Sequence, residues 1–144
     1  MKKVYDTINQ YCVEHELLTN GDGIVIGLSG GMDSVCLLQV LAALRNEWQL
    51  RLVCVHVHHG IRGTAADEDA AFAQRLAAKY NISFRLYEMD IPQLAKEQGL
   101  SEEEAGRNYR YRCFEEVRKE LNFDKIAVAH HRDDQAETVL WQIL

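Results

Sequence analysis

The chain has 144 residues, 47% of them hydrophobic and 26% charged, which is the size and composition of one folded domain. No apolar run approaches the roughly 20 residues of a membrane-spanning helix, and residues 1–6 turn polar too early for a signal peptide. The net charge of −6 argues against a general polyanion binder, because such proteins usually carry a basic field. We therefore expect one cytoplasmic domain without membrane contact. If the protein binds a nucleic acid, local basic patches or further domains would have to supply the attraction.

Hydrophobic periodicity predicts alternating helices and strands. The first segment, with Val4, Ile8, Tyr11, Cys12 and His15 at helical spacing, is an amphipathic helix that ends near Thr19–Gly23. The expected strands span residues 24–28, 52–57, 83–87 and 125–129. The expected helices between them span residues 33–46, 67–80 and 101–121, and a last helix has an apolar face of Ala136, Val139, Leu140 and Ile143.

This order of elements predicts an α/β fold. Strand–helix–strand units of this length imply a doubly wound, Rossmann-like parallel sheet with helices on both faces. Ligands of such sheets bind beyond the carboxyl ends of the strands. The polar, chemically capable residues of this chain cluster at the expected strand ends, at residues 29–31, 56–63 and 130–134. We therefore expect the functional site at that edge.

The turn after the first strand is suited to bind an anion and reads Ser29-Gly30-Gly31-Met32-Asp33-Ser34. Glycines let the backbone approach a phosphate, the serine hydroxyls add donors, and the N–H groups at the helix start favour negative charge. The lysine of a Walker loop is absent, and a lone carboxylate, Asp33, beside phosphates implies Mg²⁺ as the bridge between them. The alternative is a tight turn in which Asp33 and Ser34 are ordinary first-turn helix residues.

The segment after the second strand reads His58-His59-Gly60-Ile61-Arg62-Gly63. Its histidines do not indicate zinc, because no cysteine or third histidine falls at zinc-ligand spacing nearby. Arg62 is well placed to reach a phosphate. Alternatively, Arg62 is a solvated loop charge and the histidines fill space at a crowded strand end.

The helix expected from Ser101 begins with a capping box, because Glu104 follows that serine by three residues. A crossover helix runs antiparallel to the strands, so this helix start lies at the ligand edge of the sheet. Arg110 shares the apolar stripe of the helix and should point inward. Arg107 is better explained by an ion pair with Glu103, four residues earlier.

The last polar segment reads His130-His131-Arg132-Asp133-Asp134-Gln135-Ala136-Glu137-Thr138. Asp134 and Glu137 lie three residues apart, so on a helix they would stack on one face, where they could hold Mg²⁺ or an ammonium group. Alternatively, the acids complement the helix dipole and His130 is a core histidine.

The segment SGGMDS matches the SGGxDS signature of the PP-loop ATP pyrophosphatases, which hydrolyse the α–β bond of ATP and transfer AMP to a carbonyl-type oxygen. With HVHHGIRG, EAGRNYRYRCF and AHHRDDQAETVL in this order, the chain resembles the N-terminal domain of the tRNA(Ile)-lysidine synthetase family. The resemblance implies an adenine nucleotide alpha hydrolase-like fold over residues 1–144. It also implies that the family's C-terminal tRNA-binding domains are absent, so we expect a domain cut from a longer protein, with little or no activity alone.

Members of that family use ATP to adenylate the 2-oxygen of the wobble cytidine in the isoleucine tRNA with a CAU anticodon. The ε-amine of free L-lysine then displaces AMP to give lysidine. By resemblance, residues 29–34 bind ATP with help from His58 and Arg62, and Asp33 and Asp134 bind Mg²⁺. The resemblance also allows a homodimer of the full-length protein, and it implies that the catalytic residues are Asp33, Arg110, His131, Asp133, Asp134 and Glu137.

Two alternatives stand beside this interpretation. A PP-loop tRNA thiolase would need cysteines to carry sulfur or a cluster, but the four cysteines are widely spaced and form no CxxC pair. They are typical of small buried hydrophobic residues in a reducing compartment. A non-catalytic ATP-binding module would use the same sheet edge, yet it would have little use for the acidic pair and the inward arginine.

Overall fold

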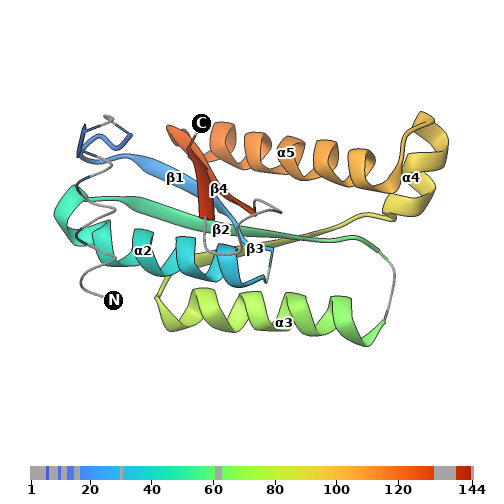
Figure 1. Cartoon of the computed structure of the whole chain (residues 1–144), viewed down its shortest axis with the longest axis horizontal. Coiled ribbons are helices and arrows are strands. Elements are labelled where there is room, and N and C mark those ends of the chain that lie inside the picture. Colours follow the sequence, from blue (N-terminus) through green and yellow to red (C-terminus); the bar gives the residue numbers. More distant parts are fainter. Residues whose placement is uncertain are drawn as a thin grey trace.

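The computed structural model describes residues 6, 10, 13–14, 17–29, 31–60, 63–131 and 139–143. Its sheet has the strand order β3-β2-β1-β4-β5 (Figure 1). The first four strands pair in parallel and β5 pairs antiparallel with β4. The strands are β1 (Gly23–Gly27), β2 (Arg51–His58), β3 (Ser83–Glu88), β4 (Lys125–His131) and β5 (Val139–Ile143).

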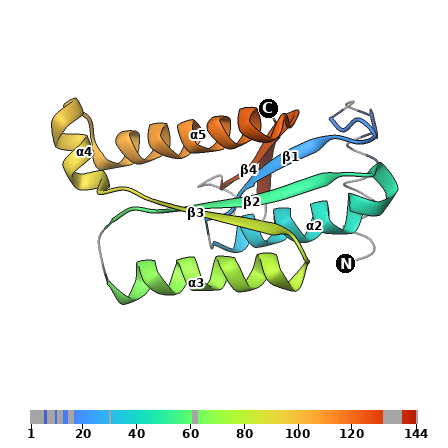
Figure 2. The ribbon, with the colours of Figure 1, turned by 180° about the vertical axis from the view of Figure 1, so that it is seen from behind.

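Helices cover both faces of this sheet, as predicted. In Figures 1 and 2, α2 and α3 lie on one face, and α5 lies on the other with α4 beside its start. The helices are α2 (Met32–Trp48), α3 (Thr64–Lys79), α4 (Ile91–Gln98) and α5 (Glu102–Leu121). None of the helices in the described ranges is long and apolar enough to cross a bilayer.

The central strand β1 shows why both faces need cover. All of its residues are buried, and successive side chains of a strand point to opposite faces. Ile24 and Ile26 belong to the core cluster under α2 and α3, whereas Val25 packs in a second cluster with Phe114 and Val117 of α5. A strand that is apolar on both sides therefore fixes the layered architecture.

The structure confirms the expected start of α5 and adds one helix that periodicity did not predict. The Ser101 hydroxyl accepts a hydrogen bond from the Glu104 N–H at 3.1 Å, which is one half of the capping box. The additional helix, α4, has only 8 residues, begins at the capping carboxylate of Asp90 and ends at Gly99 with φ +67°. A helix of two turns has too few apolar positions to show a clear helical period, so hydrophobic periodicity does not predict α4.

The end of the chain differs from the prediction. Val139–Ile143 form a strand and not a helix, with Ala127 paired to Ile143 and His131 to Val139. Short apolar runs suit either structure, and here β-prone residues satisfy backbone groups along β4. Of the expected first helix, residues 6, 10, 13 and 14 are helical, and its other residues lie outside the described part of the chain.

The strand order places a topological switch point next to β1. From β1 the chain adds β2 and then β3 on one side, and it then crosses to β4 on the other side. Ligands of open α/β sheets bind outside the carboxyl ends of the strands at such a point. The predicted phosphate-binding turn follows β1 directly.

Candidate functional site

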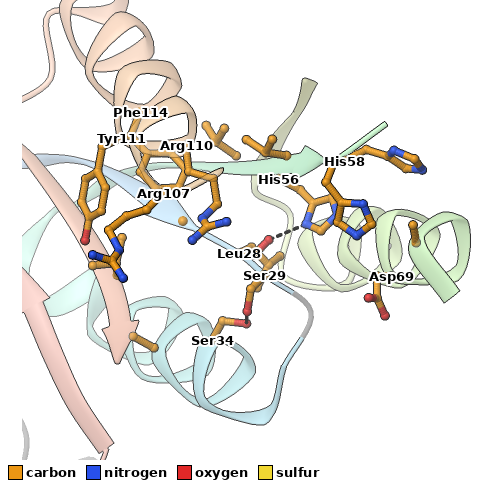
Figure 3. A pocket seen from close by; sticks show the side chains of 17 residues that line it. Leu28, Ser29, Ser34, His56, His58, Asp69, Arg107, Arg110, Tyr111 and Phe114 are labelled. Atoms are coloured by element: carbon orange, nitrogen blue, oxygen red, sulfur yellow. Dashed lines mark hydrogen bonds between the residues drawn. The ribbon is translucent and has the colours of Figure 1, made fainter. Parts of the chain in front are cut away.

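A pocket of about 480 Å³ opens at the carboxyl ends of β1, β2 and β4, between the N-terminal part of α3 and residues 107–114 of α5. The site is thus at the edge that the sequence predicted. Figure 3 shows the side chains that converge on it. Its polar lining consists of Ser29, Ser34, His56, His58, His59, Asp69, Arg107, Arg110 and Tyr111.

The turn after β1 is organised by its two serines. The Ser29 hydroxyl accepts a hydrogen bond from the Gly31 N–H at 3.2 Å and donates to the Ser34 hydroxyl at 3.1 Å. The Ser34 hydroxyl in turn donates to the Gly31 carbonyl at 2.9 Å. This network fixes the turn at the N-terminus of α2, where the N-cap residue, Gly31, has no side chain to cap the helix. The positive end of the helix dipole at this turn favours an anion.

Gly31 is not required by the backbone of the turn. Its φ of −77° and ψ of 163° are open to any residue. A Cβ at this position would meet only the Ser29 hydroxyl, at an ordinary 3.6 Å. The missing side chain instead leaves the backbone open to close approach by a ligand, which favours the anion-binding interpretation over a merely structural turn.

Asp33 lies in the first turn of α2 and is half-buried, next to Met32, which is 84% exposed. No described residue forms a hydrogen bond or ion pair with the Asp33 carboxylate. Burial, and then the negative charge of Asp33, raise the pKa of the Cys36 thiol. The described residues contain no cluster of three potential metal ligands, so any cation held by Asp33 needs further ligands from a substrate or from the rest of the chain.

The two arginines of α5 have different surroundings, as predicted. Arg107 forms an ion pair with Glu103 at 3.3 Å. Arg110 extends from α5 into the pocket (Figure 3), and its Nη1 would be 3.3 Å from a Cβ added at Gly106. Partial burial, and then the positive charge of Arg107, lower the pKa of Arg110, although a guanidinium stays charged at neutral pH. None of the described acids forms an ion pair with Arg110, so its charge is available to an anionic ligand.

His58 lines the pocket, but the chain already engages both nitrogens of its ring. The Gly60 N–H donates to Nδ1 at 3.0 Å, so Nε2 carries the proton and donates to the Asp67 carboxylate at 2.9 Å. The Gly60 backbone has φ +81°, and a Cβ there would lie 2.5 Å from the Met89 carbonyl oxygen. His58 thus ties the end of β2 to the start of α3, and its predicted contact with ATP stays a prediction.

His56 and Asp69 line the same pocket and were not among the predicted site residues. The His56 ring is buried, and its Nδ1 lies 2.6 Å from the Leu28 carbonyl oxygen. Burial lowers the pKa of His56, and the hydrogen bond to Leu28 opposes this only in part. The available signal was a histidine within an apolar strand, because such a position is more often filled by an aliphatic residue.

Several predicted residues lie outside the described part of the chain. They are Gly30, Arg62, Asp133, Asp134 and Glu137. His130 and His131 end β4, and their side chains also lie outside the description. The roles assigned to these residues therefore stay predictions.

Known proteins resemble this chain in sequence and in fold. A tRNA(Ile)-lysidine synthase from Caldanaerobacter subterraneus subsp. tengcongensis is 48% identical over 144 residues, which are 100% of this chain and 30% of that protein. The tRNA(Ile)-lysidine synthase from Geobacillus kaustophilus is 36% identical over 139 residues, 96% of this chain and 30% of that protein. The chain therefore spans about 30% of the length of these curated relatives.

Two solved structures share the fold at low sequence identity. The U34-tRNA thiolase NcsA from Methanococcus maripaludis has a TM-score of 0.67 at 21% identity, covering 90% of this chain and 46% of its own. The NH3-dependent NAD synthetase from Campylobacter jejuni has a TM-score of 0.62 at 19% identity, covering 87% and 54%. The sequence model of the PP-loop domain matches residues 2–144. This chain therefore belongs to the PP-loop domain family.

Proposed function

We propose that this chain is the ATP-binding catalytic domain of a tRNA(Ile)-lysidine synthase. The observation that carries the proposal is the whole-chain identity of 48% to a curated protein of that name, together with a pocket that offers anion-binding groups at the carboxyl ends of the strands. In the proposed reaction, ATP activates the wobble cytidine of the isoleucine tRNA with a CAU anticodon. Free L-lysine then replaces AMP.

The triphosphate would lie over the turn after β1. The start of α2 supplies backbone donors at a turn that the two serine hydroxyls hold in place, and Arg110 supplies a positive charge from the opposite wall. The half-buried carboxylate of Asp33, which has no partner among the described residues, fits Mg²⁺, which prefers oxygen ligands and shares them with phosphates. We propose Asp134 as a second ligand. Bound there, Mg²⁺ would neutralise charge on the phosphate oxygens.

The chemistry consists of two displacements. The cytidine O2 attacks the α-phosphorus, and the electron pair of the α–β bond leaves with pyrophosphate. The neutral ε-amine of lysine then attacks C2 of the activated cytidine, and the C2–O bond breaks with AMP as the leaving group. Both steps build negative charge on phosphate oxygens, so the Arg110 guanidinium and the start of α2 are suited to stabilise both transition states.

The remaining roles are proposed from the predicted motif. Glu137 is the candidate partner for the ammonium group of lysine, with His131 and Asp133 beside it and Arg110 for the lysine carboxylate. The net charge of −6 repels tRNA, so we propose that C-terminal domains in the longer protein supply most of its attraction to tRNA. The site of action would be the cytoplasm, and a homodimer of the longer protein is compatible with this scheme.

The described cysteines favour this function over a tRNA thiolase. Burial raises the pKa of the Cys54 thiol to about 12. Burial is also the largest cause of the raised pKa values of Cys36 and Cys113. Thiols of this kind carry little thiolate at neutral pH and are poor carriers of sulfur.

The deciding experiment incubates the full-length protein with ATP, lysine and the isoleucine tRNA. Formation of AMP, pyrophosphate and a lysine-modified cytidine in equal amounts is the expected result. Pyrophosphate without lysine incorporation, even at saturating lysine, would refute the ligase. Sulfur transfer to the tRNA in the presence of a sulfur donor would identify a thiolase instead, and ATP binding without turnover would identify a binding module.

A further inference from the structure

We propose that His56 recognises the adenosine half of the nucleotide, with its Nε2 accepting a hydrogen bond from an N–H or O–H group of the base or the ribose. The inference rests on the proposed function, because it assumes that ATP occupies the pocket. It assigns a specificity-determining role to a residue of the HVHHGIRG segment for which the sequence predicted no role.

The hydrogen bond of the other ring nitrogen fixes the tautomer of His56. A carbonyl oxygen can only accept, and the Leu28 carbonyl oxygen lies 2.6 Å from Nδ1, so Nδ1 carries the proton (Figure 3). In the neutral ring, Nε2 is then a bare acceptor. No described residue donates a hydrogen bond to it. The ring is 6% exposed and that small exposed part lines the pocket.

An acceptor in this state favours a ligand that donates. Nε2 is not among the fully buried unpartnered atoms of the described residues, so it is accessible from the pocket, where a ligand donor can replace water as its partner. Burial lowers the pKa of His56, so the neutral form prevails at neutral pH despite the nearby charge of Asp69. The lone pair of Nε2 would repel phosphate oxygens, but it can accept a hydrogen bond from a hydroxyl or an amino group.

The pocket separates its donors from its acceptors. The start of α2 and the Arg110 guanidinium suit the triphosphate, whereas His56 and the Asp69 carboxylate offer acceptors on the side of β2 and α3 (Figure 3). ATP has the same division, because its neutral donors are the ribose hydroxyls and the 6-amino group of adenine. With the phosphates at the turn, the adenosine half is the part that carries donors to His56.

Two substitutions separate the roles of the two ring nitrogens. In H56N the shorter amide can still donate to the Leu28 carbonyl but offers nothing at the position of Nε2. In H56Q the longer amide can place an oxygen where Nε2 lies but loses the bond to Leu28. We expect H56N to bind ATP about tenfold more weakly than the unchanged chain, and H56Q to recover part of that loss.

Nucleotide analogues identify the donor through a double-mutant cycle. The dissociation constants of ATP, 2′-deoxy-ATP, 3′-deoxy-ATP and purine riboside triphosphate, which lacks the 6-amino group, are measured for the unchanged chain and both variants. The analogue that lacks the donor to His56 should bind the unchanged chain about tenfold more weakly than ATP, and H56N should not weaken its binding further. The identity of that analogue shows whether the donor belongs to the ribose or to the base.

Each other outcome has a definite meaning. If H56N binds ATP as tightly as the unchanged chain, or if H56N and H56Q both lose the same factor for every analogue, His56 does not contact a ligand donor and the inference is wrong. If the unchanged chain binds none of the four nucleotides, the nucleotide site of the proposed function fails, and the inference fails with it.

Discussion

The Arg107 guanidinium lies 3.3 Å from the Glu103 carboxylate one turn earlier on α5, and this pairing distinguishes it from Arg110. Both arginines line the pocket, yet Arg107 already has a described acid as its partner. Arg110 has none, so its charge is available to an anion in the pocket. The two side chains therefore form a matched pair for substitution.

Arg110→Ala should lower the rates of both adenylation and lysine transfer by about a hundredfold, because a preorganised cation that faces developing phosphate charge contributes at that level. Arg107→Ala should change either rate less than about fivefold, since an exposed ion pair contributes at most about 1 kcal/mol. Single-turnover measurements with the full-length protein separate the two steps. Equal losses in the two variants would contradict the assignment of Arg110.

Asp33→Asn should abolish adenylation and leave the fold intact. The carboxylate is only half-buried and has no described partner, so its charge adds little to stability, whereas Mg²⁺ bound beside phosphates depends on that charge. Pyrophosphate release measures the activity, and thermal unfolding without nucleotide measures the fold. Turnover at the normal rate in this variant would remove Asp33 from the proposed metal site.

Two glycine substitutions should affect different properties, ATP binding at Gly31 and the stability of the fold at Gly60. Gly31→Ala should lower stability by no more than about 1 kcal/mol, because its backbone is ordinary and its Cβ finds room, while ATP binding weakens as the methyl group meets the phosphates. Gly60→Ala should instead lower stability by about 2 kcal/mol or more, because φ is +81° and the Cβ would collide with the Met89 carbonyl. Denaturant unfolding and calorimetric ATP titration test both. An unchanged ATP affinity in Gly31→Ala would argue for a purely structural turn.

The framework of the site could be predicted because local signals agreed with the global fold. The strand β1 is apolar at every position between its two glycines, and the Ser101 capping box marks the start of α5 within one residue. These two features fix the phosphate-binding turn and the wall that carries Arg110. Both follow from short-range sequence patterns, which a single sequence contains.

Features that depend on tertiary contacts were missed. Val139–Ile143 pair with β4, and the short apolar run alone cannot show that choice. His56 became a site candidate only when the bond from Nδ1 to Leu28, 28 residues away, identified its tautomer. The partners of His58 likewise come from Gly60 and Asp67, and no local sequence pattern indicated that this histidine organises the loop around it.

The buried His56 should make stability depend on pH. In the unfolded chain a histidine binds its proton at about pH 6.5, but burial lowers the pKa of His56 in the folded chain. Between these two values the unfolded chain holds more protons, so the free energy of unfolding falls as the pH drops below 6.5. The loss should reach about 1.4 kcal/mol for each unit by which the pKa is lowered.

H56N serves as the reference for this effect, because it lacks the titrating ring. The charged neighbours Asp69, His58 and His59 remain in both proteins, as do the pocket arginines, so their contributions largely cancel in the difference. Denaturant unfolding from pH 8 to pH 5 gives that difference. The stability advantage of the unchanged chain over H56N should shrink below pH 6.5, and a constant difference would show that His56 is not held neutral by burial.

Selection of lysine should depend on an acid that acts in the second step only. The attacking ε-amine must be a neutral base, while the α-ammonium and α-carboxylate of the ligand need opposite charges. We propose Glu137 for the ammonium, so Glu137→Gln should raise the lysine concentration needed for half-maximal transfer by about tenfold or more and leave pyrophosphate release unchanged. Asp33→Asn is the contrasting control, since it should stop the first step at any lysine concentration. If Glu137→Gln loses adenylation as completely as Asp33→Asn while its lysine dependence stays the same, Glu137 acts in the first step and this assignment is wrong.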